Sequence, residues 1–142
     1  MSMRAAWCFL ALWLMAFLMA AYAVEPEQVS TAVLLKARSS WDGVKYKRYP
    51  SGPVELTVLK ITIPPHTTLP WHKHPMPNAA YVESGELTVE KAEGGKTIRI
   101  VAGEVLPEMV NARHRGFTGD TPAVLVVFYA GVEGMPLSQP AN

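Results

Sequence analysis

The sequence has little cysteine and no large excess of charge of either sign. Its single cysteine is Cys8, so the chain cannot form an internal disulfide. Lysine and arginine together number 13 against 12 acidic residues, and the densest basic stretch, residues 45–48, has no second basic run beside it. A surface that binds nucleic acid or an anionic membrane needs a broader basic patch, so the composition predicts neither partner.

Several common chemistries are also missing. The sequence contains no glycine-rich phosphate loop and no Cys-x-x-Cys pair. Neither Ser51 nor Ser84 has a histidine and an acidic residue at a spacing typical of a nucleophilic triad. These absences leave the four histidines of the chain as its main candidates for chemistry.

The N-terminus has the layout of a secretory signal peptide. Arg4 precedes residues 5–21, which carry no charge, and Ala21-Tyr22-Ala23 fits an A-x-A cleavage site. A membrane anchor is the alternative, but the run is at the short end of what spans a bilayer. We therefore expect a signal peptide over 1–23, a single domain over 24–142, a periplasmic or secreted location, and no membrane association after cleavage.

After residue 23 the sequence shows short β-rich runs separated by turn residues, and no helical periodicity. Many short strands with short turns are typical of an antiparallel sandwich or small barrel, so we expect an all-β fold. Gly94-Gly95 is the clearest hairpin turn. Residues 134–142, with two prolines, are expected to form a tail. The predicted strands cover residues 32–37, 54–63, 79–83, 86–91, 97–101, 105–110 and 123–129.

Three of the histidines fall in two suggestive places. His72 and His74 are two residues apart, and on a strand such residues point to the same face, roughly 6–7 Å apart. His114 follows 40 residues after His74 and could complete a metal site from a neighbouring strand. The alternative for an isolated His-x-His pair is two surface histidines at the end of a strand.

The spacing around these histidines extends the pattern. Asn78 follows the His-x-His pair after three intervening residues and Gly85 follows after six more, while ten residues separate Gly103 from His114. This resembles the cupin family, whose motifs are G-x5-HxH-x3-E-x6-G and G-x5-P-x-G-x2-H-x3-N. The resemblance covers residues 54–129 and implies an antiparallel double-stranded β-helix, that is, a jelly-roll or cupin barrel.

By position, the resemblance implies that His72, His74 and His114 bind a divalent metal ion, whether Fe, Mn, Zn, Ni or Cu. It also implies a homodimer. Asn78 stands where the family has a glutamate ligand. Asn78 is therefore expected either to bind the metal through its amide oxygen or to hydrogen-bond the hairpin backbone. Four further positions depart from the family pattern: His66 and Asn111 at glycines, Met109 at a proline and Thr118 at an asparagine.

Glu108 interrupts an apolar run six residues before His114. A charge on a buried strand is costly unless it is paired or metal-bound, so Glu108 is a candidate metal ligand or catalytic general base. In the alternative interpretation it faces solvent or pairs with Arg113 or Arg115.

The remaining residues near the histidines have plainer roles. His66 follows two prolines and is expected to be an exposed turn residue outside the site. The alternation of a strand directs Trp71 and Tyr81 away from the metal and brings Ala80 and Val82 to its side.

Two functions follow from these predictions. Three histidines leave positions of the ion open, as a catalytic metal requires, which favours dioxygenase- or isomerase-like chemistry on a small organic molecule. The alternative is a non-catalytic module that binds a metal or a small ligand.

Overall fold

The computed structural model describes residues 28–141, and the folded unit begins at Val33. The predicted signal peptide over 1–23 lies outside the described residues. Within the part of the chain that is described, no helix is both long and apolar enough to cross a membrane.

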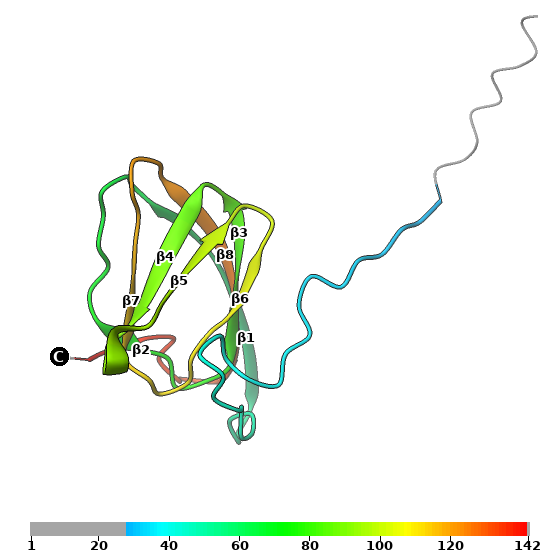
Figure 1. Ribbon diagram of the computed structural model, residues 1–142. Coiled ribbons are helices and arrows are strands. Elements are labelled where there is room, and N and C mark those ends of the chain that lie inside the picture. Colours follow the sequence, from blue (N-terminus) through cyan, green and yellow to red (C-terminus); the bar gives the residue numbers. More distant parts are fainter. Residues whose placement is uncertain (1–27, 142) are drawn as a thin grey trace, which may run out of the picture. The chain divides into compact units, whose positions relative to one another are not determined.

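The fold is all-β, with two antiparallel sheets that face each other (Figure 1). One sheet has the order β1-β8-β3-β6 and the other the order β5-β4-β7-β2-β9. A 3-10 helix, η1 (Glu93–Gly95), forms the predicted turn between β4 and β5. The strands are β1 (Val54–Ile63), β2 (His72–Lys73), β3 (Asn78–Ser84), β4 (Glu86–Lys91), β5 (Thr97–Val101), β6 (Val105–Pro107), β7 (His114–Phe117), β8 (Ala123–Val132) and β9 (Gln139–Pro140).

Alternation along the strands places the core between the sheets. In β8, residues 123, 125, 127 and 129 are buried while most of their neighbours are only partly buried. In β3, Asn78, Ala80 and Val82 face the same interior. Asn78 therefore lies in a row of inward-facing residues that is otherwise apolar.

Several predicted element boundaries differ from the structure. Residues 32–37 are exposed and form no strand, because their backbone makes no ladder pairing with any of the described strands. β6 ends at Pro107 rather than at residue 110, since the chain then turns at Asn111, whose φ is 57°. The expected tail over 134–142 contributes β9, which pairs with β2 at His72 and Lys73.

Backbone conformation explains two of the departures from the cupin pattern. His66 (φ 52°) and Asn111 (φ 57°) are the two non-glycine residues with positive φ among those described. Both stand at positions where the family pattern has glycine, the residue that adopts this conformation most easily. The local backbone is thus kept although the residue type is not.

Thr118 replaces the final asparagine of the pattern. It is buried, and its hydroxyl donates to the carbonyl of Pro64 at 2.6 Å and accepts from the amide of Thr67 at 3.0 Å. These bonds hold the end of β7 against the loop that leads to the His-x-His pair.

Candidate metal centre

Strand pairing brings the three histidines together. His72 in β2 lies directly opposite His114 in β7, and His74 follows β2 immediately. The ring centroids are 4.5 Å apart for His72 and His114, and 5.0 Å apart for each of the other two pairs. One ring nitrogen from each histidine lies within 4.8 Å of the other two, so these residues could hold a metal ion.

Backbone carbonyls fix the tautomer of each imidazole. Nδ1 of His72 lies 2.8 Å from the carbonyl of Pro70, that of His74 lies 2.7 Å from Leu137 and that of His114 lies 2.9 Å from Ala112. A carbonyl oxygen only accepts, so each Nδ1 must carry the proton and donate it. Each Nε2 of a neutral ring is then left with a free lone pair, which is the form that binds metals.

Burial keeps the three rings neutral. It lowers the pKa of His72 and of His114 below the usual value, and it lowers the pKa of His74 to about 4. The cause in each case is the loss of solvent around the charged form. A metal ion would therefore not have to displace a proton from these rings near neutral pH.

Glu108 is buried beside this cluster, with 8% of its surface exposed. Its Oε2 lies 3.5 Å from Nε2 of His114, too far for a hydrogen bond. The interpretation in which Glu108 faces solvent or pairs with Arg113 or Arg115 is therefore wrong. Arg115 pairs with Glu90 instead, at 2.8 Å.

The burial of Glu108 alters its acidity. Loss of solvent around the carboxylate raises its pKa to about 7, and the nearby His72 and a hydrogen bond from the backbone of Met109 only partly oppose this. A carboxyl group with such a pKa exchanges a proton near neutral pH, as a general acid or base must.

Asn78 lies across the ladder from Glu108. The backbone amide of Glu108 donates to the Asn78 carbonyl at 3.1 Å, so Glu108, the residue after β6, lies level with Asn78 at the start of β3. The Asn78 amide group donates to the carbonyl of Met76 at 3.4 Å. This contact is long, and it leaves the Asn78 side-chain oxygen without a partner among the described residues.

Three buried polar atoms here lack hydrogen-bond partners within residues 28–141: Oδ1 of Asn78, Oε2 of Glu108 and Nε2 of His114. All three can donate a lone pair, and buried polar atoms are rarely left unsatisfied. A divalent cation would bind the histidine nitrogen and the amide oxygen and would attract the nearby carboxylate, so the residues present fit a metal ion.

Two features of the site were not predicted from the sequence. Tyr129 in β8 is buried with its ring centroid 5.7 Å from that of His74, and burial raises its pKa to about 12. The alternation of β8 could have identified it as an inward residue. The carbonyl of Leu137, which orients His74, lies in the segment expected to be a tail, and a backbone acceptor leaves no signal in the sequence.

The plainer predictions hold. His66 is exposed, and its Nε2 lies 3.6 Å from Oδ1 of Asp120. It is not part of the cluster of three histidines. Trp71 contacts the guanidinium groups of Arg113 and Arg115 rather than the histidines. Ala80 and Val82 are buried on the same face of β3 as Asn78.

The cupin domain family model matches residues 59–129. A search of curated proteins gives no match.

Solved structures share the fold at low sequence identity. The DMSP lyase DddQ from Ruegeria pomeroyi is 22% identical with a TM-score of 0.52, over 57% of this chain and 41% of that one. A double-stranded β-helix protein from Klebsiella pneumoniae is 20% identical with a TM-score of 0.52, over 68% and 85%.

Oxalate decarboxylase from Bacillus subtilis, described with Mn(II) centres, is 20% identical with a TM-score of 0.52, over 60% of this chain and 23% of that one. The chain thus spans about two fifths of the lyase chain and a smaller share of the decarboxylase. At these identities the likeness concerns the fold, and the family match covers half of the sequence. The chain belongs to the cupin superfamily.

Proposed function

We propose that the protein is a metal-dependent enzyme that acts on a small organic molecule. In this proposal His72, His74 and His114 hold a divalent ion, and Glu108 transfers a proton. The observation that carries the proposal is a buried carboxylate oxygen, Oε2 of Glu108, that has no hydrogen-bond partner among the described residues and lies 3.5 Å from the equally unsatisfied Nε2 of His114.

The histidines would hold the ion through Nε2, since Nδ1 of each ring is engaged by a carbonyl. Asn78 would offer a neutral oxygen to the same ion. When bound, the ion would act as a Lewis acid at the positions that the protein leaves open. Imidazole ligands suit Fe, Mn, Zn, Ni and Cu, so availability decides which of these is present.

Glu108 would act as the proton acceptor. Without the ion its pKa is about 7, and a bound cation would lower this pKa and favour the ionised carboxylate, which is the form that accepts a proton from a substrate. Tyr129 would close the neighbouring wall as a neutral phenol, because its pKa is far above neutral pH. A base beside the ion favours lyase- or isomerase-like chemistry, in which a C–H proton is removed. A redox-active ion would instead favour dioxygenase-like chemistry.

The substrate class follows from the same chemistry. A divalent ion held by neutral ligands retains its positive charge, which favours a small organic acid as substrate. Structures that share the fold include a DMSP lyase and an oxalate decarboxylase, which supports small organic acids as compounds to be tested first.

We also propose that the chain is exported and cleaved after Ala23, because the Ala21-Tyr22-Ala23 sequence fits a signal-peptidase site. Intact mass of the exported protein would then give an N-terminus at Val24. A full-length mass in the membrane fraction would instead support an anchor.

Proton transfer can be tested in D2O by NMR with the metal-loaded protein and a panel of small organic acids that carry C–H bonds next to an activating group, DMSP among them. We expect conversion or C–H exchange of at least one compound, and a rate at least about a hundredfold lower for Glu108→Gln. Metal content is measured for both proteins, so that loss of the ion is not mistaken for loss of the base. Equal rates would contradict the role of Glu108, and a loaded protein inert toward the whole panel would favour the non-catalytic binding module.

A further inference from the structure

A cavity separate from the three histidines lies beside the segment that precedes β1. Its volume is about 610 Å³, within the range of small-molecule sites, and none of His72, His74 and His114 lines it. One wall is the segment 44–51, and the opposite wall includes residues 109–112, which connect Glu108 to β7.

The charged side chains that line this cavity are mostly cationic. Lys45, Lys47 and Arg48 contribute positive charge, and none of them has an ion-pair partner within residues 28–141. The single acidic residue of the lining is Asp42, which is already bonded to Lys91 at 2.6 Å and to Ser40 at 2.5 Å. The cavity therefore carries uncompensated positive charge.

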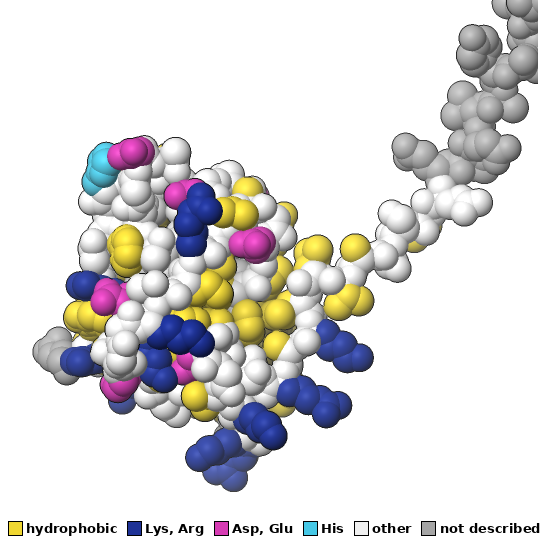
Figure 2. Space-filling view, in the orientation of Figure 1, with side chains coloured by type: hydrophobic (Ala, Val, Ile, Leu, Met, Phe, Trp, Pro, Cys, Tyr) yellow, Lys and Arg dark blue, Asp and Glu magenta, His cyan; other side chains and the backbone are white. Residues whose placement is uncertain are grey.

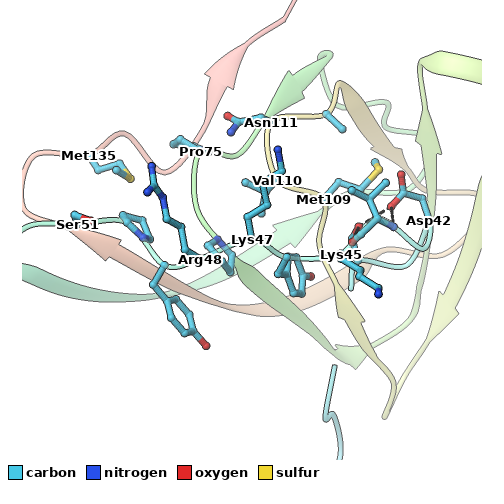
Figure 3. Close-up of a pocket in the computed structure, with 17 residues that line it drawn as sticks. Asp42, Lys45, Lys47, Arg48, Ser51, Pro75, Met109, Val110, Asn111 and Met135 are labelled. Carbon is cyan, nitrogen blue, oxygen red and sulfur yellow. Dashed lines mark hydrogen bonds between the residues drawn. The ribbon is translucent and has the colours of Figure 1, made fainter. Parts of the chain in front are cut away.

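The pictures agree with this distribution. Figure 2 shows Lys and Arg side chains gathered at the lower edge of the molecule, where the segment before β1 lies. In Figure 3 the Arg48 side chain extends toward Met135, and the Lys47 side chain extends toward Val110 and Asn111. In this view both side chains are directed toward residues of the opposite wall.

Much of the remaining lining is apolar or aromatic. A ligand attracted by the positive charge would lie against prolines, methionines and tyrosines rather than against further charges. The residues concerned are Val44, Tyr46, Tyr49, Pro50, Pro75, Pro77, Met109, Val110, Ala112 and Met135.

The start of the cationic segment is anchored to the barrel. The hydroxyl of Tyr46 donates to the backbone carbonyl of Glu108 at 2.7 Å, and Asp42 is tied to Lys91 in β4. The Tyr46 amide also donates to the carbonyl of Arg38 at 3.0 Å. The cavity wall is therefore formed before a ligand arrives, which lowers the entropic cost of binding.

We propose that this cavity binds a small organic anion with an apolar body, such as an aromatic or aliphatic carboxylate. Arg48 holds the carboxylate and Lys47 adds positive charge within the same cavity, because charge-assisted hydrogen bonds are the strongest polar contacts that a guanidinium group makes. The apolar walls hold the body of the ligand. The proposal does not depend on the metal centre, since no residue of that cluster takes part.

The test uses three probes with the metal-free protein: 2-naphthoate, its neutral counterpart 2-naphthamide, and inorganic phosphate. Binding is followed by fluorescence for the two aromatic probes and by calorimetry for phosphate. We expect saturable binding of 2-naphthoate that is at least about tenfold tighter than that of either other probe. NMR shift changes should include Asn111 and Met135.

The variant K47Q/R48Q should weaken 2-naphthoate binding at least about tenfold. The matched control K60Q/R99Q removes the same charge from residues outside the cavity, in β1 and β5, and should retain binding. Equal loss in both variants would reduce the effect to net charge and overturn the proposal. Equal affinity for 2-naphthamide would also overturn it, because the cations would then not contribute to binding. Equal affinity for phosphate would overturn it too, because the apolar walls would then not contribute.

Discussion

Burial changes the proton affinity of the site residues in opposite senses. It lowers the pKa of His74 to about 4 and raises the pKa of Glu108 to about 7. Both shifts favour the neutral form, since a low-dielectric interior penalises charge of either sign. A cation at this position would find unprotonated nitrogens and would stabilise the ionised carboxylate, so the same burial that disfavours charge prepares the site for a metal.

The shift of Glu108 predicts a pH-dependent stability in the metal-free protein. Its folded pKa lies above its unfolded pKa, so its contribution to stability is full below about pH 4.5 and is lost as pH rises to about 7. The variant Glu108→Gln cannot ionise at this position, so it does not lose stability as pH rises. We expect the variant to exceed the wild type by about 3 kcal/mol in free energy of unfolding at pH 8, with the difference vanishing near pH 4.

Urea denaturation at the two pH values measures this difference. Glu83→Gln is the control, since Glu83 is an exposed glutamate paired with Lys60, and it should show no such gain at pH 8. A difference that is the same at both pH values would mean that Glu108 does not retain its proton in the folded protein.

The three histidines predict a specific pattern of metal affinity. Replacing His72, His74 or His114 by Ala should weaken divalent metal binding by more than about a hundredfold, because each removes a direct ligand. His66→Ala should leave the affinity unchanged, since that residue is exposed and outside the cluster. Competition with a chromophoric chelator measures the metal affinity of each variant. A loss in His66→Ala as large as that in His114→Ala would invalidate the choice of ligands.

At the scale of elements, two glycines with positive φ give a matched comparison. A Cβ on Gly85 would lie 1.8 Å from the Pro122 carbonyl oxygen, whereas one on Gly103 would meet nothing within 4 Å. Gly103→Ala should therefore cost about 1–2 kcal/mol from backbone strain alone. Gly85→Ala should cost more than about 4 kcal/mol, because the start of β8 must also move. Chemical denaturation measures the free energy of unfolding of both variants. Equal losses of stability would contradict the close approach of Gly85 to the Pro122 carbonyl.

The sequence predicted those elements whose pattern is local. β1, β4 and β5 have the predicted bounds, because alternation and flanking turns mark them. β2, β7 and β9 were not predicted. They are short and contain charged residues, glycine or proline, and they form because neighbouring strands complete their ladders.

The same distinction holds for the site. The three histidines were predicted because the sequence keeps the His-x-His pair and the residue spacing of the two cupin motifs. The burial of Glu108 could not be predicted, because it depends on β6 pairing with β3 so that Glu108 lies opposite Asn78. An acidic residue in an apolar run allowed both the buried and the exposed interpretation, and only the fold decides between them.

At the scale of the whole molecule, the outer face of β1 predicts self-association. β1 is the edge strand of its sheet, and its Leu56 and Val58 are 63% and 61% exposed. Phe128 lies opposite Val58 in β8 and is 41% exposed, which extends the apolar face. Because an open edge with apolar side chains favours pairing, we expect the homodimer that the family resemblance implies.

Light scattering should give a dimer mass for the wild type and a monomer mass for L56K/V58K. Thr62→Lys adds a charge to the same strand near its end and should remain dimeric. A monomeric wild type would refute this prediction without affecting the metal centre.

The central claim is that one divalent ion binds between His72, His74 and His114, and anomalous scattering from a metal-loaded crystal tests it most directly. The account predicts one anomalous peak per chain, with Nε2 of each of the three histidines about 2.0–2.2 Å away. A peak coordinated by His66, or a loaded protein with no peak between the three rings, would contradict it.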